Sequence, residues 1–406
     1  MLTAVYLTAV MGDVLLAWRQ QTVDEDIAAQ YAEASAIEAT RFREQDIPEI
    51  QAAVADGYAQ SLYLSSFDTS ARHRALAEKY GIAPLAPQPR SSLLYCNEGY
   101  GLVRYVSDRY GFRNSDATWD HEQLDAVLVG DSFVHGACVG DDQTISGHLA
   151  RAGLTVLNLG TGGNGPIQYA ALAKTFVPRT SPRFVFVFFH PNDNLDETGS
   201  VYRSVFFGTS AAQYFDGPDD AHARPISKAL GALYAEASEM LRYPSPGAEL
   251  KPAPLVTRES VDEPFLARVG RSLRLTHLRA AFTAISSGER LETNLPWSTR
   301  LAVDTTLAVC PKPSCTAAFV FVTNSDYWSP DHRADAYKRS LRHYVQSRAG
   351  ASSFLDTSEG IKELGRSGFA PAGKHYSPDG YARVAGQVQQ MIESAGSARL
   401  NSLDKN

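Results

Sequence analysis

The feature that most constrains the fold is an unbroken apolar run, FVFVFF, at 184–189. A strand with one face in water would alternate apolar and polar residues, and this run does not alternate. Mainly apolar runs also lie at 126–129, 155–159 and 317–322, with a weaker one at 353–355. Such strands are covered on both faces, so the runs predict a buried parallel sheet.

Helix-like stretches separate these runs, at 143–152, 167–176 and 332–348. Alternation of strand and helix predicts a doubly wound α/β fold with three layers, α/β/α. Gly, Asn, Asp or Ser follows each apolar run. Ligands of such sheets bind beyond the carboxyl ends of the strands, so we expect the functional site there.

The spacing of the strands changes once, between the third and the fourth. More than a hundred residues separate them, far more than one strand–helix connection needs. We interpret 195–316 as an inserted helical lid or cap, with amphipathic segments at 226–242 and 264–286. A decorated loop without a function is the alternative.

The rest of the chain is expected to divide into an extension and a core. Residues 21–90 read as a helical extension that ends in a proline-rich linker from 81 to 90. The predicted catalytic domain then covers 91–194 and 317–396. Its first part begins with an irregular segment rich in Tyr, Gly and Arg.

The N-terminal residues 1–20 are expected to be an anchor or an interfacial helix. Residues 1–18 are mostly apolar, but Asp13 interrupts them, and a basic region or a small-residue cleavage site is lacking. A periplasmic or membrane-anchored place in the cell envelope is the expectation, with the cytoplasm as the alternative. The net charge of -7 argues against a nucleic-acid partner.

The four cysteines predict little by themselves. Cys310 and Cys315 bracket a tight Pro-Lys-Pro-Ser turn, and either form a small disulfide loop or stay as thiols. A disulfide would indicate an oxidising compartment. Cys96 and Cys138 stand alone in the sequence. Neither pair has further ligands at metal spacing, so we predict no metal site.

Four groups of polar residues follow the predicted strands or precede the last helix. They contain Ser132 in Gly-Asp-Ser, Gly163 in a glycine-rich loop, Asn192 in His-Pro-Asn-Asp, and His375. Ser132 is either a helix N-cap or a nucleophile. A nucleophilic serine needs a base, for which His375 is the candidate. The backbone N–H groups of Ser132 and Gly163 and the Asn192 amide are candidate donors to an oxyanion.

These four blocks resemble the SGNH hydrolases, or GDSL esterase/lipase superfamily, over roughly 124–195 and 317–392. The resemblance implies a flavodoxin-like SGNH hydrolase fold with Ser132 and His375 as catalytic residues. Asp131 and Asp193 would support the turn and the Asn192 loop through side-chain-to-backbone bonds. The DRYGFRN segment at 108–114 and the stretch at 321–331 are similar to bacterial members linked to acylation of cell-envelope polysaccharide.

Two positions depart from the family pattern. The family usually has an Asp two or three residues before the His, but these positions hold Gly373 and Ala372 here. We therefore expect a Ser–His dyad, or a histidine held by a backbone carbonyl or another acid such as Asp356 or Asp379. The second departure is His190, where the family often has Gly.

The predicted function is a serine esterase or O-acyltransferase that acts on acylated carbohydrate, with O-acetyl groups as the expected substrate. Ser132 and His375 would form and resolve an acyl-enzyme without a cofactor. The expected partner is a carbohydrate or another small ester, with membrane association through the N-terminal segment. The alternative is a non-catalytic carbohydrate-binding or polysaccharide-assembly protein that retains an SGNH shell, an idea prompted by the missing acid.

Overall fold

The structure is a computed structural model of the whole chain. It describes residues 6, 8–15, 46–194, 202, 214–215, 227–240, 295–323 and 332–403. The chain divides into two compact units, Met1–Arg41 with Pro244–Thr293, and Phe42–Tyr243 with Asn294–Asn406. In the first unit the described residues are helical, at 6 and 8–15. Every element and contact below belongs to the second unit.

The main sheet of the second unit is parallel throughout. Its strands are β4 (Leu124–Val129), β5 (Val156–Asn158), β6 (Pro182–Phe189), β7 (Thr316–Phe321) and β8 (Phe354–Asp356). They lie in the order β5-β4-β6-β7-β8, with Val127 opposite both Leu157 and Val185. This is the flavodoxin-like order, and all five strands match the apolar runs of the sequence.

The unbroken apolar runs are explained by two hydrophobic cores, one on each face of the sheet. Phe184, Phe186 and Phe188 contribute to one core, whereas Val185, Val187 and Phe189 contribute to the other. Because successive side chains of a strand point to opposite faces, both sets must be apolar. Polar residues do not alternate with apolar ones in these strands, because neither face of the sheet is exposed to water.

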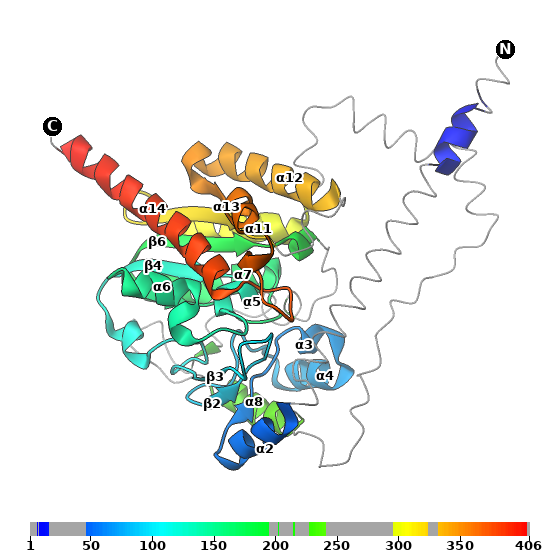
Figure 1. Cartoon of the computed structure of the whole chain (residues 1–406), viewed down its shortest axis with the longest axis vertical. Helices are drawn as coiled ribbons and strands as arrows, with labels where there is room; N and C mark the ends of the chain where they lie inside the picture. Colours follow the sequence, from blue (N-terminus) through cyan, green and yellow to red (C-terminus); the bar gives the residue numbers. More distant parts are fainter. Residues whose placement is uncertain are drawn as a thin grey trace. The chain divides into compact units, whose positions relative to one another are not determined.

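Helices cover both faces, which confirms the three-layer α/β/α fold (Figure 1). The first core contains residues of α5 (Ser132–His135), α6 (Ile145–Arg151), α13 (Ser358–Leu364) and α14 (Pro378–Leu403). The second contains residues of α7 (Pro166–Phe176), α11 (Trp297–Val309) and α12 (His332–Ala349). The predicted helices at 143–152, 167–176 and 332–348 are thus confirmed.

The N-terminal part of this unit adds a small second sheet and three helices. The elements are α2 (Ile47–Ala55), β1 (Ala59–Gln60), α3 (Ser66–Thr69), α4 (Ala71–Tyr80), β2 (Ser92–Leu94) and β3 (Arg104–Val106). β1 pairs with β2 in parallel, and β2 pairs with β3 in antiparallel. The structure differs from the linker expected at 81–90, because residues 82–88 are buried. This stretch is packed into the body and does not behave as an exposed connection.

Within the predicted insertion at 195–316, the structure describes two helices, α8 (Lys228–Met240) and α11. α11 packs on α7 and α8 packs on α4, and both supply residues to the second core. These two helices are therefore part of the packed body. The amphipathic stretch at 264–286 lies outside the described residues, as does most of 1–20. No helix among the residues that the structure describes is long and apolar enough to cross a membrane.

Short 3-10 helices complete the described elements. They are η2 (Asp116–Asp120), η3 (Asp141–Gln143), η4 (Val177–Arg179), η5 (Pro191–Asn194), η9 (Ala351–Ser353) and η10 (Gly365–Gly368). η5 follows β6, and η10 precedes the loop that leads into α14. η5 contains Asn192, and the loop after η10 contains His375. Both residues are candidates from the sequence.

Candidate active site

Ser132 lies directly beyond the carboxyl end of β4, at the first position of α5. The N-cap of α5 is Asp131, whose carboxylate accepts a hydrogen bond from the Phe133 N–H at 2.9 Å. The capping role that the sequence left open for Ser132 therefore belongs to its neighbour. The turn is tight, since a Cβ on Gly130 would lie 2.4 Å from Val134 Cγ2. The Ser132 hydroxyl is left for another partner.

That partner is His375, whose Nε2 lies 2.8 Å from Ser132 Oγ. His375 is in the loop between η10 and α14. Ala370 N–H donates to the His375 carbonyl at 2.9 Å, and Ser377 N–H donates to the Gly368 carbonyl at 3.0 Å. These bonds hold the loop in a hairpin-like shape. The structure thus brings together two predicted residues that are far apart in the sequence.

A carboxylate from a distant part of the sequence contacts His375: that of Glu98, from the loop between β2 and β3. Glu98 Oε1 lies 2.7 Å from His375 Nδ1, and Oε2 accepts from the His375 backbone N–H at 3.3 Å. Of the alternatives that the sequence left open, the structure has a histidine held by another acid: His375 contacts both a serine and a carboxylate. Of the two acids named from the sequence, Asp356 pairs with Arg342 and Lys338, and Asp379 is exposed in the first turn of α14.

Gly373, at the position of the family's acid, makes room for Glu98. A Cβ on Gly373 would lie 1.8 Å from Glu98 Cδ and 2.2 Å from each carboxylate oxygen. No real Cβ comes so close to another atom. A side chain at 373 and the Glu98 carboxylate in its present position therefore exclude one another. The glycine at 373 therefore leaves the space that the Glu98 carboxylate occupies.

The electrostatics of this pair favour a carboxylate and a defined imidazole tautomer. Burial alone would raise the pKa of Glu98, but the charge of His375 and hydrogen bonds from the His375 side chain and backbone outweigh it. The net result is a pKa below the ordinary value. An ionised Glu98 can only accept, so His375 Nδ1 carries the proton. In the neutral ring, Nε2 then has a lone pair that faces the Ser132 hydroxyl.

Asp131 behaves in the opposite way. Its side chain is buried beneath the turn, and burial raises its pKa to about 6, against the opposing effects of the Phe133 N–H and His375. Asp131 thus titrates close to neutral pH. Its contact with the α5 backbone agrees with the supporting role predicted for it.

The glycine-rich loop lies against the nucleophile turn. Thr161 N–H donates to the Gly130 carbonyl at 3.2 Å, and Gly162 N–H donates to His135 Nδ1 at 3.2 Å. Gly163 has a φ of +77°, and a Cβ there would lie 2.7 Å from Ser65 Oγ. Only glycine fits this position and this conformation. The loop that carries the predicted donor is therefore fixed beside α5.

The block that contains Asn192 also contacts the nucleophile turn, through His190. The His190 ring stacks on Phe133, next to Ser132, with ring centroids 4.8 Å apart. His190 Nδ1 lies 2.7 Å from Asn192 Oδ1. The backbone N–H of the exposed Asn192 donates to the same nitrogen at 3.3 Å, so two contacts with His190 hold Asn192 in place. Asp193 accepts from the His190 backbone N–H at 2.8 Å and so braces this turn.

All four cysteines form disulfides, Cys96 with Cys138 and Cys310 with Cys315. The first pair stood apart in the sequence, and its bond links the Glu98 loop to the segment after α5. Glu98 was missed because no local pattern marks it as part of the site, and it lies 277 positions from His375. A pairing of Cys96 with Cys138 is the one sequence feature that would have brought residue 98 near Ser132.

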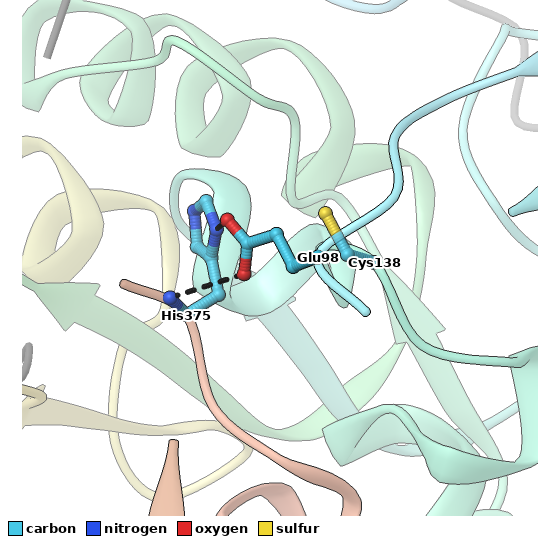
Figure 2. A group of neighbouring side chains, drawn as sticks. All are labelled: Glu98, Cys138 and His375. Carbon is cyan, nitrogen blue, oxygen red and sulfur yellow. Dashed lines mark hydrogen bonds and ion pairs between the residues drawn. The ribbon is translucent and has the colours of Figure 1, made fainter. Parts of the chain in front are cut away.

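Glu98, Cys138 and His375 also form a group of residue types that bind metal ions, with ligand atoms within 4.8 Å of one another (Figure 2). The Cys138 sulfur is bonded to Cys96, so it is not the thiolate that a metal requires. Glu98 and His375 are hydrogen-bonded to each other. We interpret the group as an acid–base pair beside a disulfide.

No family model and no curated protein matches this chain. Among solved structures, the chain is similar to the Clostridium thermocellum family 3 carbohydrate esterase, at 15% identity and a TM-score of 0.33. The match covers 67% of this chain and 98% of the esterase. We base the function on the geometry of the site itself.

Proposed function

We propose that this protein is a serine esterase or O-acyltransferase of the SGNH type, with Ser132, His375 and Glu98 as its catalytic triad. One observation carries the proposal: the two ring nitrogens of His375 lie 2.8 Å from the Ser132 hydroxyl and 2.7 Å from the Glu98 carboxylate. Nucleophile, base and orienting acid are the three parts that activate a serine. These parts come from three separate elements.

In the proposed mechanism, Ser132 Oγ attacks the ester carbonyl while its proton passes to His375 Nε2. The imidazolium that forms is stabilised by the Glu98 carboxylate at Nδ1, and Glu98 keeps its charge. The C–O bond to the leaving alcohol then breaks, and His375 returns the proton to the departing oxygen. Water or a second hydroxyl group attacks the acyl-enzyme with the same base, which regenerates Ser132.

The oxyanion of the tetrahedral intermediate would be bound by the backbone N–H groups of Ser132 and Gly163 and by the Asn192 amide. Two contacts support this assignment. The bond from Gly162 to His135 fixes the loop that carries Gly163, and the contact with His190 fixes Asn192 before substrate binds. A fixed donor is effective since it needs no reorganisation during the reaction.

The substrate class that we propose is an O-acylated carbohydrate, with acetyl as the acyl group. This step rests on the resemblance of the four sequence blocks and of the DRYGFRN segment to proteins of polysaccharide acylation. Two disulfides favour an oxidising compartment, which agrees with the proposed place in the cell envelope. Hydrolysis and transfer use the same residues, so both stay in the proposal.

The test is covalent labelling by a fluorophosphonate probe, followed by acetate release from O-acetylated glycans. We expect Ser132→Ala and His375→Ala to abolish labelling, and Glu98→Gln to slow it by about 10³- to 10⁴-fold, as expected for loss of a triad carboxylate. Asp379→Asn is the matched control, because Asp379 is an exposed acid in the first turn of α14, whereas the carboxylate at His375 Nδ1 is that of Glu98. A folded native protein that is not labelled would overturn the proposal.

The non-catalytic alternative was motivated by the absent acid at 372 and 373. Glu98 supplies a carboxylate in the required contact with His375, and this removes that motivation. We therefore favour catalysis. Equal labelling of the native protein and the Glu98→Gln variant would instead assign Glu98 a purely structural role.

A further inference from the structure

The loop that carries Glu98 is compact and is fixed from several sides. Asn97 Oδ1 accepts hydrogen bonds from the N–H groups of Gly99 and Gly101, at 2.9 and 3.2 Å. Asn97 Nδ2 in turn donates to Asp46 at 2.9 Å. On the far side, Ala372 N–H donates to the Glu98 carbonyl at 3.0 Å. All these contacts are hydrogen bonds of a partly exposed loop, each of modest net strength.

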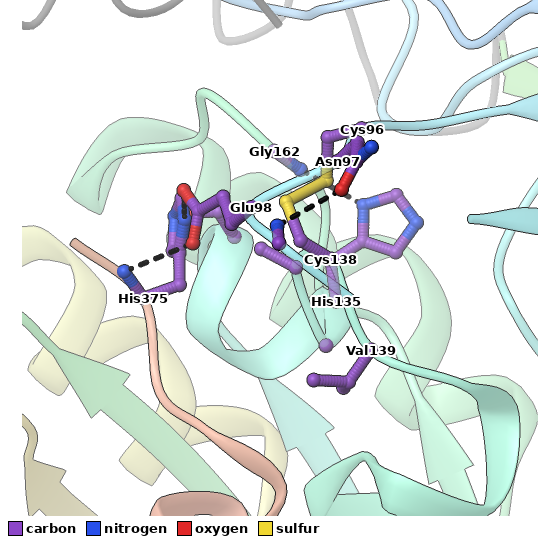
Figure 3. Close-up of a disulfide and its surroundings, with 12 residues drawn as sticks. Cys96, Asn97, Glu98, His135, Cys138, Val139, Gly162 and His375 are labelled. Atoms are coloured by element: carbon purple, nitrogen blue, oxygen red, sulfur yellow. Dashed lines mark hydrogen bonds and ion pairs between the residues drawn. A yellow bond between two sulfur atoms is a disulfide. The ribbon is translucent and has the colours of Figure 1, made fainter. Parts of the chain in front are cut away.

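One restraint on this loop is covalent, the disulfide between Cys96 and Cys138 (Figure 3). Both cysteines are buried, with 6% and 1% of their surface exposed. Cys138 has a φ of +61°, a conformation that residues other than glycine rarely adopt. The surrounding structure must therefore hold Cys138 in place, which makes it a firm anchor.

This disulfide joins the acid to the nucleophile by a short route. Cys96 precedes Glu98 by two residues, and Cys138 follows Ser132 by six. Ala137, which directly precedes Cys138, lies in the same small core as both cysteines. Along the backbone alone, residues 98 and 132 are connected through all of β3, η2 and β4. The cross-link therefore restricts how far Glu98 can move from the turn that carries Ser132.

We propose that the Cys96–Cys138 disulfide is a positioning element of the active site, which keeps the Glu98 carboxylate in contact with His375. The inference rests on the proposed function of the triad. In the family pattern, the acid lies on the same loop as the histidine and needs no additional tether. Here the acid comes from a distant segment, and the disulfide takes over that restraint.

The test is a double-mutant cycle that combines Cys96→Ser/Cys138→Ser with Glu98→Gln. A catalytic group displaced by about 1 Å can lose about 100-fold in rate, so we expect kcat to fall by roughly 10- to 100-fold in the disulfide-free enzyme. KM for a small ester should change little, since neither cysteine lies on the nucleophile or the base. In the Glu98→Gln background the same cysteine changes should cost nothing further, because no carboxylate is left to position.

The matched control is Cys310→Ser/Cys315→Ser, which removes the other disulfide at the turn before β7. We expect this variant to retain the native kcat. Should the serine pair at 96 and 138 not fold, Cys96→Ala/Cys138→Ala takes its place, because it keeps the site apolar and adds no β-branched side chain at the positive φ of position 138. Thermal unfolding of each variant separates lost stability from lost positioning.

Two results would overturn the inference. One is a native kcat in the folded disulfide-free enzyme. The other is an equal loss in the native and Glu98→Gln backgrounds, which would mean that the disulfide acts on the whole site and not through Glu98. Failure of the proposed function itself would look different, since the native protein would then show no fluorophosphonate labelling at all.

Discussion

The exclusion between Gly373 and Glu98 gives the most specific prediction. Gly373 does not have a positive φ, so an alanine is compatible with the backbone. Its Cβ would nevertheless lie 1.8 Å from Glu98 Cδ, whereas carbon atoms in contact are about 3.5 to 4.0 Å apart. The carboxyl group must therefore retreat by about 2 Å in Gly373→Ala.

The size of the effect follows from the hydrogen bond that this retreat breaks. The distance from Glu98 Oε1 to His375 Nδ1 is 2.7 Å in the native protein. A retreat of that size takes it to about 4.5 Å, well beyond hydrogen-bond range. Loss of a triad carboxylate costs about 10⁴-fold in kcat, or about 5.5 kcal/mol of transition-state stabilisation. We expect Gly373→Ala to lose most of this, approaching Glu98→Gln.

The assay is steady-state hydrolysis of a p-nitrophenyl acyl ester, with the labelling rate as a second readout. Gly386→Ala is the matched control, because a Cβ there meets no atom within 4 Å in the middle of α14. Its activity should stay native, and its helix should gain up to about 1 kcal/mol. In a Glu98→Ala background, Gly373→Ala should cause no additional loss.

The converse change is the sharpest check. Gly373→Asp in the Glu98→Ala background puts an acid at one of the two positions that the resemblance to SGNH hydrolases implies, and should recover part of the lost kcat. The reasoning is refuted if Gly373→Ala is as active as the native enzyme while Glu98→Gln is impaired. A loss in Gly373→Ala that persists unchanged without Glu98 would refute it equally.

Three further predictions concern neighbouring groups. Asn192→Ala should lower kcat about 10²- to 10³-fold with a smaller change in KM, measured on the same ester, if its amide binds the oxyanion. Burial raises the pKa of Asp131 to about 6, so the folded protein binds more protons than the unfolded chain between about pH 4 and 6. The contribution of Asp131 to the free energy of unfolding should therefore fall by about 3 kcal/mol as pH rises through this window. Urea unfolding of the Asp131→Asn variant should lack this pH dependence. Tyr100, 44% exposed two residues beyond Glu98, should act as a stacking surface for a sugar ring, so Tyr100→Ala should raise KM for an acetylated glycan. An equal rise in KM for p-nitrophenyl acetate would contradict that role.

The fold was largely predictable because its signal is local. Strands such as β6 are buried on both faces, and this burial leaves an uninterrupted apolar run that can be read directly. The ends of those strands then collect Ser132, the Gly163 loop and Asn192 at one edge, which follows from the parallel topology alone. His375 was predicted in a different way, as the base that a nucleophilic serine needs and from the resemblance of the four blocks, and its Nε2 lies 2.8 Å from Ser132 Oγ.

The acid was not predictable, because nothing local marks it. Glu98 lies in a loop of a separate small sheet, and its role depends on how that sheet packs against the loop before α14. The burial of residues 82–88 was missed for a related reason: prolines indicate a break in regular structure but do not indicate exposure. Both errors concern tertiary packing of segments without periodic patterns.

The order of the triad along the chain has a consequence for biosynthesis. Glu98 is made first, Ser132 next, and His375 only among the last residues. Cys96 and Cys138 are both available before His375 exists, so the acid can be tethered beside the serine while the base is still absent. If the proposed triad is correct, the serine of a growing chain therefore stays without its base until the segment that carries His375 has folded onto the rest.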